Sequence, residues 1–364
     1  MNSYQSLHLE LMDRVFNIIP SGFILIMIIM MSLTLRYWEG ISNYFSIKPY
    51  RKIQRVHENE VPRLGGFFIL FFLIASSFFT FKSDLLIIIL LSSIPLFSVA
   101  FVEDLLQLGK PIYRLMAIII SIILFFILSR IDLPHIDPAA FNLLLDIGPL
   151  RYLFFIFSVT VIVNGINLND GMNGLATLTV LFQFLSLFYL ALTFNDNDFM
   201  MMVSLCIIPI FIFLLFNFPF GKLFLGDSGA YLLAFISALL TLVLFSRHPS
   251  IFSWTAILIL FYPSMELLFS FIRKKIFYKM SPFSPDDQHL HTLIYKYLLN
   301  IKFGKKVANN LTTCILSPLY ILPFIFIYFF SNEIMIILSI LFLSLLYLCY
   351  YGVFYKINII NFKL

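Results

Sequence analysis

Charged residues are scarce in this 364-residue chain, where Asp, Glu, Lys and Arg together make up 12% of the sequence. That is about half the fraction of a typical soluble domain, so a water-soluble globular protein is excluded. Cysteine is also scarce. Cys206, Cys314 and Cys349 lie in apolar stretches without paired spacing, which excludes a disulfide framework and a cysteine-bound metal. We interpret them as small buried hydrophobic residues.

Apolar residues are correspondingly abundant: 61% of the chain is hydrophobic, and 45 residues are Phe. A membrane-spanning helix needs about 20 apolar residues. The predicted fold is all-α and polytopic, a single integral membrane domain over residues 1–364 with eleven spans. The first run lacks a small-residue cleavage site, so we read it as a span. The expected spans are 16–37, 64–81, 84–102, 112–130, 151–168, 172–194, 199–217, 226–246, 251–272, 311–330 and 333–355.

Basic residues set the orientation of these spans. With the N-terminus outside, 19 of the 24 Lys and Arg residues fall on inner segments, including eight in the loop 273–310. The positive-inside rule therefore makes that loop cytoplasmic. The net charge of +5 reflects these loops and not a nucleic-acid surface. The same orientation places nearly all unusual polar clusters on the inner side, which favours one composite active site on the cytoplasmic face.

Two adjacent carboxylates, Glu103 and Asp104, end the third span. At a membrane boundary such a pair is costly unless it binds a cation or titrates. The ordinary alternative is a helix end that emerges into water.

A second cluster begins in the last turn of the fifth span and continues beyond it, where polar residues recur at a spacing of three. They are Asn164, Asn167, Asp170 and Asn173. This spacing aligns them along one helix face. Amides with one carboxylate suit a hard cation, a sugar or a base; the alternative is a polar seam between helices.

Asp227 lies in Gly-Asp-Ser-Gly at the start of the eighth span. A carboxylate beside backbone N–H groups at a helix N-terminus suits a metal close to a phosphate. The alternative is that Asp227 simply caps its own helix.

The cytoplasmic loop carries His289 and His291, which suit pyrophosphate binding or proton transfer. A histidine pair on a surface is the ordinary alternative. Arg63 and Lys110, with Arg114, are expected to face anionic phosphates, or to anchor to lipid headgroups.

Taken together, these segments resemble the polyprenyl-phosphate N-acetylhexosamine-1-phosphate transferase superfamily of MraY/WecA type, over residues 50 to 300. The loop SPFSPDDQHLHTLI resembles the family pattern SPFSPDRxHxHHLI, close to its WecA-like branch. NGINLNDGMNGLA resembles NAxNLxDGxDGLA, FLGDSG resembles the GDxGS motif, and HENEVPRLGG resembles HxxxxPRxGG. VEDLL stands where the family has an aspartate pair.

Four positions depart from the family pattern. Glu103 and Asn173 stand where the family has aspartate, Asp287 replaces a basic residue, and Thr292 replaces the last histidine. The cation ligand of the GDxGS motif matches Asp227, and an asparagine that aids the cation matches Asn167. Both are kept, which favours an active enzyme.

The resemblance implies transfer of N-acetylhexosamine 1-phosphate from a UDP-sugar to undecaprenyl phosphate in the bacterial inner membrane. It implies Mg²⁺ at Asp227 and Asn167, with Mn²⁺ as the second choice. Asp104, Glu103 and Asp170 would be catalytic; Asn164, Asn167, Asn173, Arg63, Lys110, His289 and His291 would bind substrate. We expect membrane lipid as a partner and no nucleic acid; a homodimer is compatible with the sequence. The alternatives are a flippase for lipid-linked sugars and an inactive relative that binds polyprenyl phosphate.

Overall fold

The computed structural model describes residues 21–44, 61–79, 82–106, 110–138, 140–277, 279 and 287–361. Within these ranges the secondary structure is helical, without a strand. The first helices are α2 (Ser21–Tyr44), α3 (Gly65–Phe79), α4 (Asp84–Leu106), α5 (Pro111–Ser129), α6 (Ala140–Leu145), α7 (Leu150–Asn169), α8 (Leu175–Thr193) and α9 (Asn197–Asn217). The rest are α10 (Gly226–Arg247), α11 (Trp254–Ile259), α12 (Phe261–Ile272), a π-helical turn (Arg273–Phe277), α13 (Leu290–Asn300), α14 (Lys305–Ile315), α15 (Ser317–Phe329) and α16 (Glu333–Asn361).

The prediction of an all-helical polytopic membrane protein is confirmed. Nine helices in the described part of the chain are long and apolar enough to cross a membrane. The other two expected spans are shorter pieces. α3 has only 15 residues, and the segment 251–272 is divided between α11 and α12. Pro263 explains the division, because a proline lacks the N–H and its ring clashes with the carbonyl four residues earlier, at Ile259.

Helix α10 forms the centre of the bundle. α3, α4, α7 and α8 all pack against it, and its side chains from Ser228 to Phe245 are buried. A helix that is apolar on every side belongs in such a core. The small residues Gly229, Ala230 and Ala234 let neighbouring helices approach closely.

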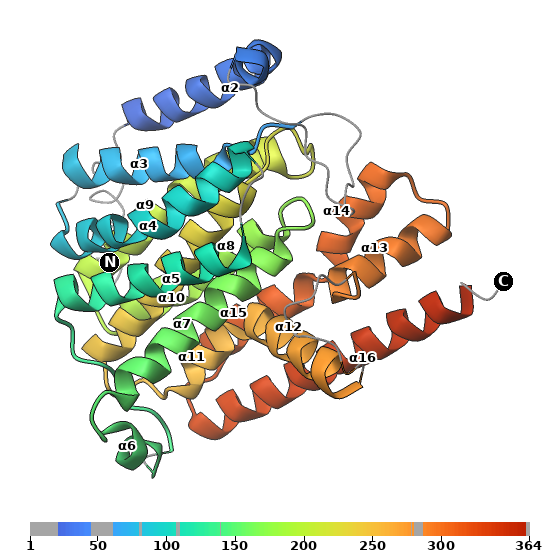
Figure 1. Ribbon diagram of the computed structural model, residues 1–364. Coiled ribbons are helices and arrows are strands. Elements are labelled where there is room, and N and C mark those ends of the chain that lie inside the picture. Colours follow the sequence, from blue (N-terminus) through green and yellow to red (C-terminus); the bar gives the residue numbers. More distant parts are fainter. Residues whose placement is uncertain are drawn as a thin grey trace, which may run out of the picture.

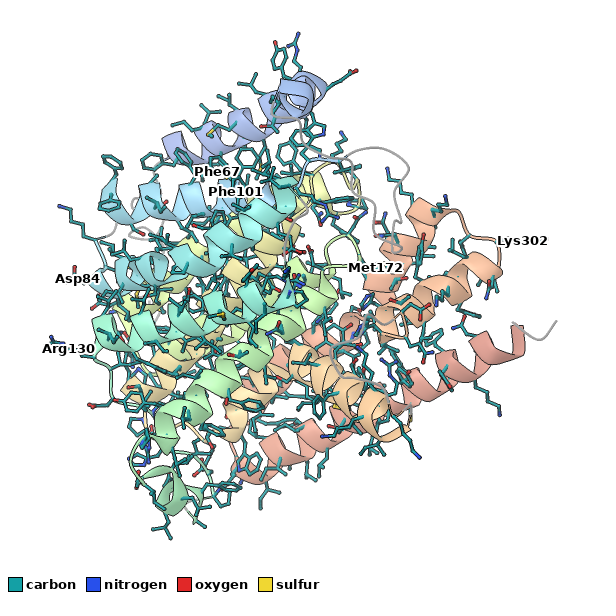
Figure 2. All side chains as sticks on the ribbon, in the orientation of Figure 1. Phe67, Asp84, Phe101, Arg130, Met172 and Lys302 are labelled. Atoms are coloured by element: carbon teal, nitrogen blue, oxygen red, sulfur yellow. The ribbon has the colours of Figure 1, made fainter. Side chains whose placement is uncertain are left out.

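The two ends of the bundle are formed by different segments of the chain. Met172 and Lys302 lie toward one end, and Asp84 and Arg130 toward the other (Figure 2). The first end gathers the C-termini of α4 and α7, the N-termini of α8 and α10, and helices α13 and α14 (Figure 1). The positive-inside rule predicts that this end is cytoplasmic, so we call it the inner end.

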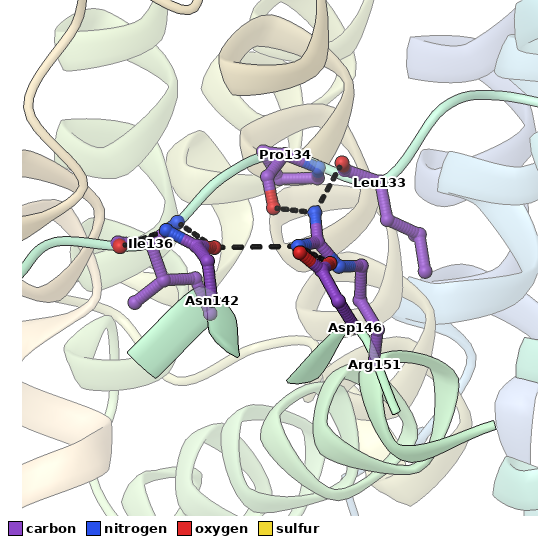
Figure 3. Close-up of polar contacts among 6 residues, drawn as sticks. All are labelled: Leu133, Pro134, Ile136, Asn142, Asp146 and Arg151. Atoms are coloured by element: carbon purple, nitrogen blue, oxygen red, sulfur yellow. Dashed lines mark hydrogen bonds and ion pairs between the residues drawn. The ribbon is translucent and has the colours of Figure 1, made fainter. Parts of the chain in front are cut away.

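The outer end carries a long connection between α5 and α7 that a single arginine organises (Figure 3). Arg151 donates to the carbonyls of Leu133 at 3.3 Å and Pro134 at 3.4 Å. It also pairs with Asp146 and donates to Asn142 at 3.4 Å. The guanidinium thereby satisfies backbone oxygens of the loop and ties α6 to the start of α7.

Candidate active site

The inner end begins with a close crossing of two chain segments. Gly65 and Gly66 donate their backbone N–H groups to the carbonyls of Phe224 and Leu225, each at 3.0 Å. A Cβ on Gly66 would lie 2.4 Å from the backbone of Gly229. Only glycine allows this approach, so the glycines at the start of α3 serve close helix contact. The crossing fixes the loop that leads into α10.

Asp104 caps helix α10 from a neighbouring helix. Its Oδ1 accepts from the backbone N–H of Asp227 at 2.9 Å, and its Oδ2 accepts from Ser228 at 2.8 Å. Gly226 has φ +79°, and a Cβ there would lie 2.7 Å from Oδ2 of Asp104. The cap that sequence reasoning considered for Asp227 thus comes from Asp104 on α4. The side chain of Asp227 is not needed for capping.

Arg114, at the start of α5, lies between two carboxylates. Its Nε is 3.4 Å from Oε2 of Glu103, and its Nη1 is 3.4 Å from Oδ2 of Asp227. Tyr231 lies against the same guanidinium, and Asn167 donates to the Tyr231 hydroxyl at 3.4 Å. Arg114 therefore lies beside the carboxylates and offsets part of their negative charge, while its expected contact with phosphate stays a prediction.

Asp170 follows the last residue of α7 and lies within electrostatic reach of the same group. Its pKa is well above the ordinary value, first because of burial and then because of the charges on Asp227 and Asp104, while Arg63 opposes the rise. The structure therefore brings together three carboxylates, from α4, the end of α7 and α10. Mutual repulsion of this kind favours a bound cation or a retained proton.

The donor set fits Mg²⁺ when phosphate oxygens complete the shell. No group of three His, Cys, Asp or Glu side chains in the described ranges is close enough to form a metal cage alone. Mg²⁺ in phosphate-handling enzymes usually takes one or two carboxylates plus substrate oxygens. Asp227 supplies a carboxylate, and the buried Oδ1 of Asn167 has no hydrogen-bond partner among the described residues. A buried amide oxygen without a partner is suited to this role.

Three further residues were predicted to bind substrate. Asn164 is tied within its own helix, donating to the carbonyl of Thr160 at 2.8 Å. Lys110 lies exposed at the start of α5, whereas Arg63 is partly buried at the start of α3 and acts on Asp170. The proposed substrate contacts of these three residues stay predictions.

Helix α14 holds the loop of Asn173, a contribution that sequence reasoning missed. Asn309 accepts from the backbone N–H of Asn173 at 2.8 Å, and Thr313 donates to its carbonyl at 2.8 Å. Asn310 accepts from the Asn173 side chain at 3.4 Å. Asn309 and Thr313 are fully buried. The sequence signal for this contact was the adjacent pair Asn309 and Asn310 in an apolar stretch. Buried polar groups in a membrane segment usually have a defined partner.

Both histidines of the loop between α12 and α13 are buried rather than on the surface. His289 and His291 are each 5% exposed, and their rings are parallel with centroids 5.7 Å apart. Burial, with a contribution from the charge of His289, lowers the pKa of His291 to about 4, against an opposing effect of Glu266. The His291 ring lies against Gly171, where a Cβ would be 2.9 Å from its Nε2. The histidine loop therefore contacts the loop that carries Asp170.

The π-helical turn after α12 and helix α16 support the histidine loop. Arg273 donates to the carbonyl of Gln288 and to the hydroxyl of Tyr351, the latter at 2.6 Å. Asn358 donates to the carbonyl of Leu293 at 3.0 Å. The helix that follows the histidines is α13, and these contacts fix its beginning.

The fold and site define a multi-pass membrane protein whose carboxylates, amides and histidines converge at one face. Residues 86–245 match the family model described as glycosyl transferase family 4. An undecaprenyl-phosphate alpha-N-acetylglucosaminyl 1-phosphate transferase of Thermotoga maritima is 28% identical over 256 residues, which cover 69% of this chain and 72% of the relative. A phospho-N-acetylmuramoyl-pentapeptide-transferase of Dictyoglomus thermophilum is 31% identical over 224 residues, 58% of this chain and 70% of the relative.

The chain belongs to glycosyl transferase family 4, of MraY/WecA type, and is a member of its phospho-N-acetylhexosamine transferases. The resemblance found in the motifs is thereby confirmed.

Proposed function

We propose that this chain transfers N-acetylhexosamine 1-phosphate from a UDP-N-acetylhexosamine, such as UDP-N-acetylglucosamine, to undecaprenyl phosphate at the cytoplasmic face of the bacterial inner membrane. The product would start a lipid-linked cell-surface glycan. The observation that carries the proposal is the convergence of Asp104, Asp170 and Asp227 at the inner end, beside the histidine loop. Clusters at one end of the spans suit a membrane-surface reaction better than transport, whose sites lie near the bilayer midplane.

In the proposed reaction an oxygen of undecaprenyl phosphate attacks the sugar-bearing phosphorus, and the bond to UMP breaks in the same step. Mg²⁺ held by Asp227 and Asn167, with Mn²⁺ as the second choice, would neutralise charge on the leaving UMP. Asp104 keeps Asp227 in place through the first turn of α10. With Glu103 it orients or deprotonates the acceptor phosphate, and Asp170 would hold the nucleotide or the metal.

The donor would be held by groups that surround these carboxylates. His289 and His291 contact the pyrophosphate or the sugar, while Asn164, Asn167 and Asn173 contact the nucleotide or the sugar. Arg63 and Lys110 carry the positive charge that the phosphates require. Burial of the histidine pair and the fixed loop of Asn173 support these roles, because groups held rigidly by hydrogen bonds position a substrate better than free side chains.

A labelled donor tests the proposal. Purified protein in detergent is incubated with undecaprenyl phosphate, Mg²⁺ and a panel of UDP-sugars that carry ³²P in the sugar-bearing phosphate. We expect UMP as the soluble product and label in the lipid fraction for one or more N-acetylhexosamine donors. Release of UDP, with label left in the aqueous phase, would instead indicate simple glycosyl transfer. Absence of any product across the panel would support an inactive relative.

A further inference from the structure

Glu266 is a buried carboxylate on the apolar helix α12 that the proposed reaction does not use. Its side chain is 1% exposed. A charge so buried is tolerated only when other groups satisfy its oxygens. Three donors do so: Oε1 lies 3.0 Å from Nδ1 of His289 and 3.2 Å from the backbone nitrogen of Leu290, and Oε2 accepts from the hydroxyl of Tyr347 at 2.9 Å.

These contacts decide which nitrogen of His289 carries hydrogen. Both oxygens of an ionised carboxylate accept hydrogen bonds, and neither can donate one. Because Leu290 offers a backbone N–H to Oε1, that oxygen acts as an acceptor, and Nδ1 of His289 must also donate to it. In the neutral ring Nε2 is then the nitrogen with the free lone pair. Tyr347 holds the other oxygen, so the carboxylate is fixed from both sides.

The ring of His291 lies between His289, which Glu266 fixes, and the loop that carries Asp170. His289 is parallel to His291, with an interplanar angle of 3°. His291 lies against Gly171, the residue that follows Asp170. The Nδ1 atom of His291 is buried without a hydrogen-bond partner among the described residues, so its neighbour His289 is the member of the pair with a fixed orientation.

We propose that Glu266 is a positioning residue that holds His289 with hydrogen on Nδ1 and presents Nε2 to the donor diphosphate or sugar. This inference rests on the proposed function for the role of His289. Glu266 acts by orienting the His289 ring, and this role does not require its negative charge. A glutamine has nearly the same shape, and its amide oxygen accepts from Nδ1 and Leu290 as the carboxylate does. A methionine fills a similar volume but accepts no strong hydrogen bond.

The first experiment compares Glu266→Gln with Glu266→Met in the full-length enzyme, using the UMP-release assay. We expect Glu266→Gln to stay within about tenfold of wild type and Glu266→Met to lose at least about 100-fold in kcat, as when an orienting partner of a working histidine is removed. Glu333→Met, at the far end of α16, is the control substitution and should leave the rate unchanged. Equal and small losses in both Glu266 variants would overturn the inference.

The second experiment reads the position of the hydrogen without turnover. Protein with ¹⁵N-labelled histidine is compared with His289→Asn to assign the His289 signals. We expect hydrogen on Nδ1 in wild type and in Glu266→Gln, and a change toward hydrogen on Nε2 in Glu266→Met. An unchanged tautomer in Glu266→Met would refute the inference even if activity is lost. Because this measurement needs no substrate, it remains readable if UMP release by the wild type fails and the proposed function falls.

A double-mutant cycle separates positioning from stability. If Glu266 acts only through His289, adding Glu266→Met to His289→Asn should cost little beyond the loss in His289→Asn alone. A further loss as large as that in the wild-type background would show a purely structural role. If Glu266→Met does not fold, Glu266→Asp takes its place, because its carboxylate is one methylene short of His289 and should give the same change of tautomer.

Discussion

The carboxylate of Asp104 accepts a hydrogen bond from the backbone of Asp227, at 2.9 Å, although the two residues are 123 positions apart. Two aspartates that look like a pair of independent ligands therefore form one unit. One builds the first turn of α10, and the other projects from that turn toward Arg114. Substitutions at the two positions should consequently differ in what they damage.

Asp104→Asn should lower both stability and rate. An asparagine turns one of its two terminal atoms into a donor, so a backbone N–H of Asp227 or Ser228 loses its acceptor; such a lost cap costs about 1 kcal/mol. We expect a loss of more than about 100-fold in UMP release, whereas Glu103→Asp should stay within about tenfold. Initial rates at saturating UDP-sugar are the measurement. Greater damage in Glu103→Asp would show that the catalytic carboxylate is Glu103.

Asp227→Asn should abolish turnover while the protein remains folded, because the side chain is free of capping and available to the cation. We expect the Tm in detergent to stay within about 3 °C of wild type, with no rate recovered at high Mg²⁺. Asp84→Asn, the same substitution at the outer end, is the control and should keep full activity. A near wild-type rate in Asp227→Asn would place the cation elsewhere.

Gly66→Ala should destabilise the inner end. Its Cβ would lie 2.4 Å from the backbone of Gly229, so α3 and α10 must separate. Overpacking of this kind costs about 1–3 kcal/mol. Gly352→Ala in α16 has nothing within 4 Å of the new Cβ and should not lower stability. The measurement is thermal unfolding of both variants in the same detergent. Equal Tm values would contradict the close contact between α3 and α10 at Gly66.

Stability should depend on pH through Asp196 at the outer end. Burial raises the pKa of this carboxyl, but hydrogen bonds from Phe199, His248 and Arg247 outweigh it, so the pKa is below the ordinary value. A lowered folded-state pKa means that the stabilisation is present above the unfolded pKa, about 3.9, and is lost as the pH falls further.

We therefore expect Asp196→Asn to have a lower Tm than wild type at pH 7, with the difference shrinking as the pH falls below about 4. Asp198→Asn removes an exposed carboxylate two residues away and should show little change across the same range. A difference for Asp196→Asn that persists undiminished at the acid end would exclude this linkage.

The orientation is tested by accessibility of single cysteines. In a background with Cys206, Cys314 and Cys349 replaced by alanine, Ser250→Cys should react with an impermeant maleimide in intact cells. Lys302→Cys should react only after permeabilisation, because the positive-inside rule predicts that the basic loop is cytoplasmic. Labelling of Lys302→Cys in intact cells would place the site on the wrong side of the membrane.

The sequence by itself determined the class, the approximate position of the spans and the grouping of polar segments at one end. A bilayer imposes length and apolarity on each span separately, so these properties are readable from local composition. The division of the ninth span into two helices at Leu260 was not predicted from local composition, although Pro263 indicates it in the sequence. The resemblance singled out Asp104, Asp170 and Asp227, but not their arrangement.

Only the tertiary structure decided which polar groups meet. Asp104 caps a helix that begins 122 residues later, Glu266 fixes His289, and Asn309 holds the backbone of Asn173 from 136 residues away. Hydrogen bonds of this kind depend on how helices pack, and packing follows from side-chain shape on several helices at once. No periodicity along the chain records them. For that reason the sequence shows only a carboxylate within an apolar segment at Glu266, and the structure shows its partner, His289.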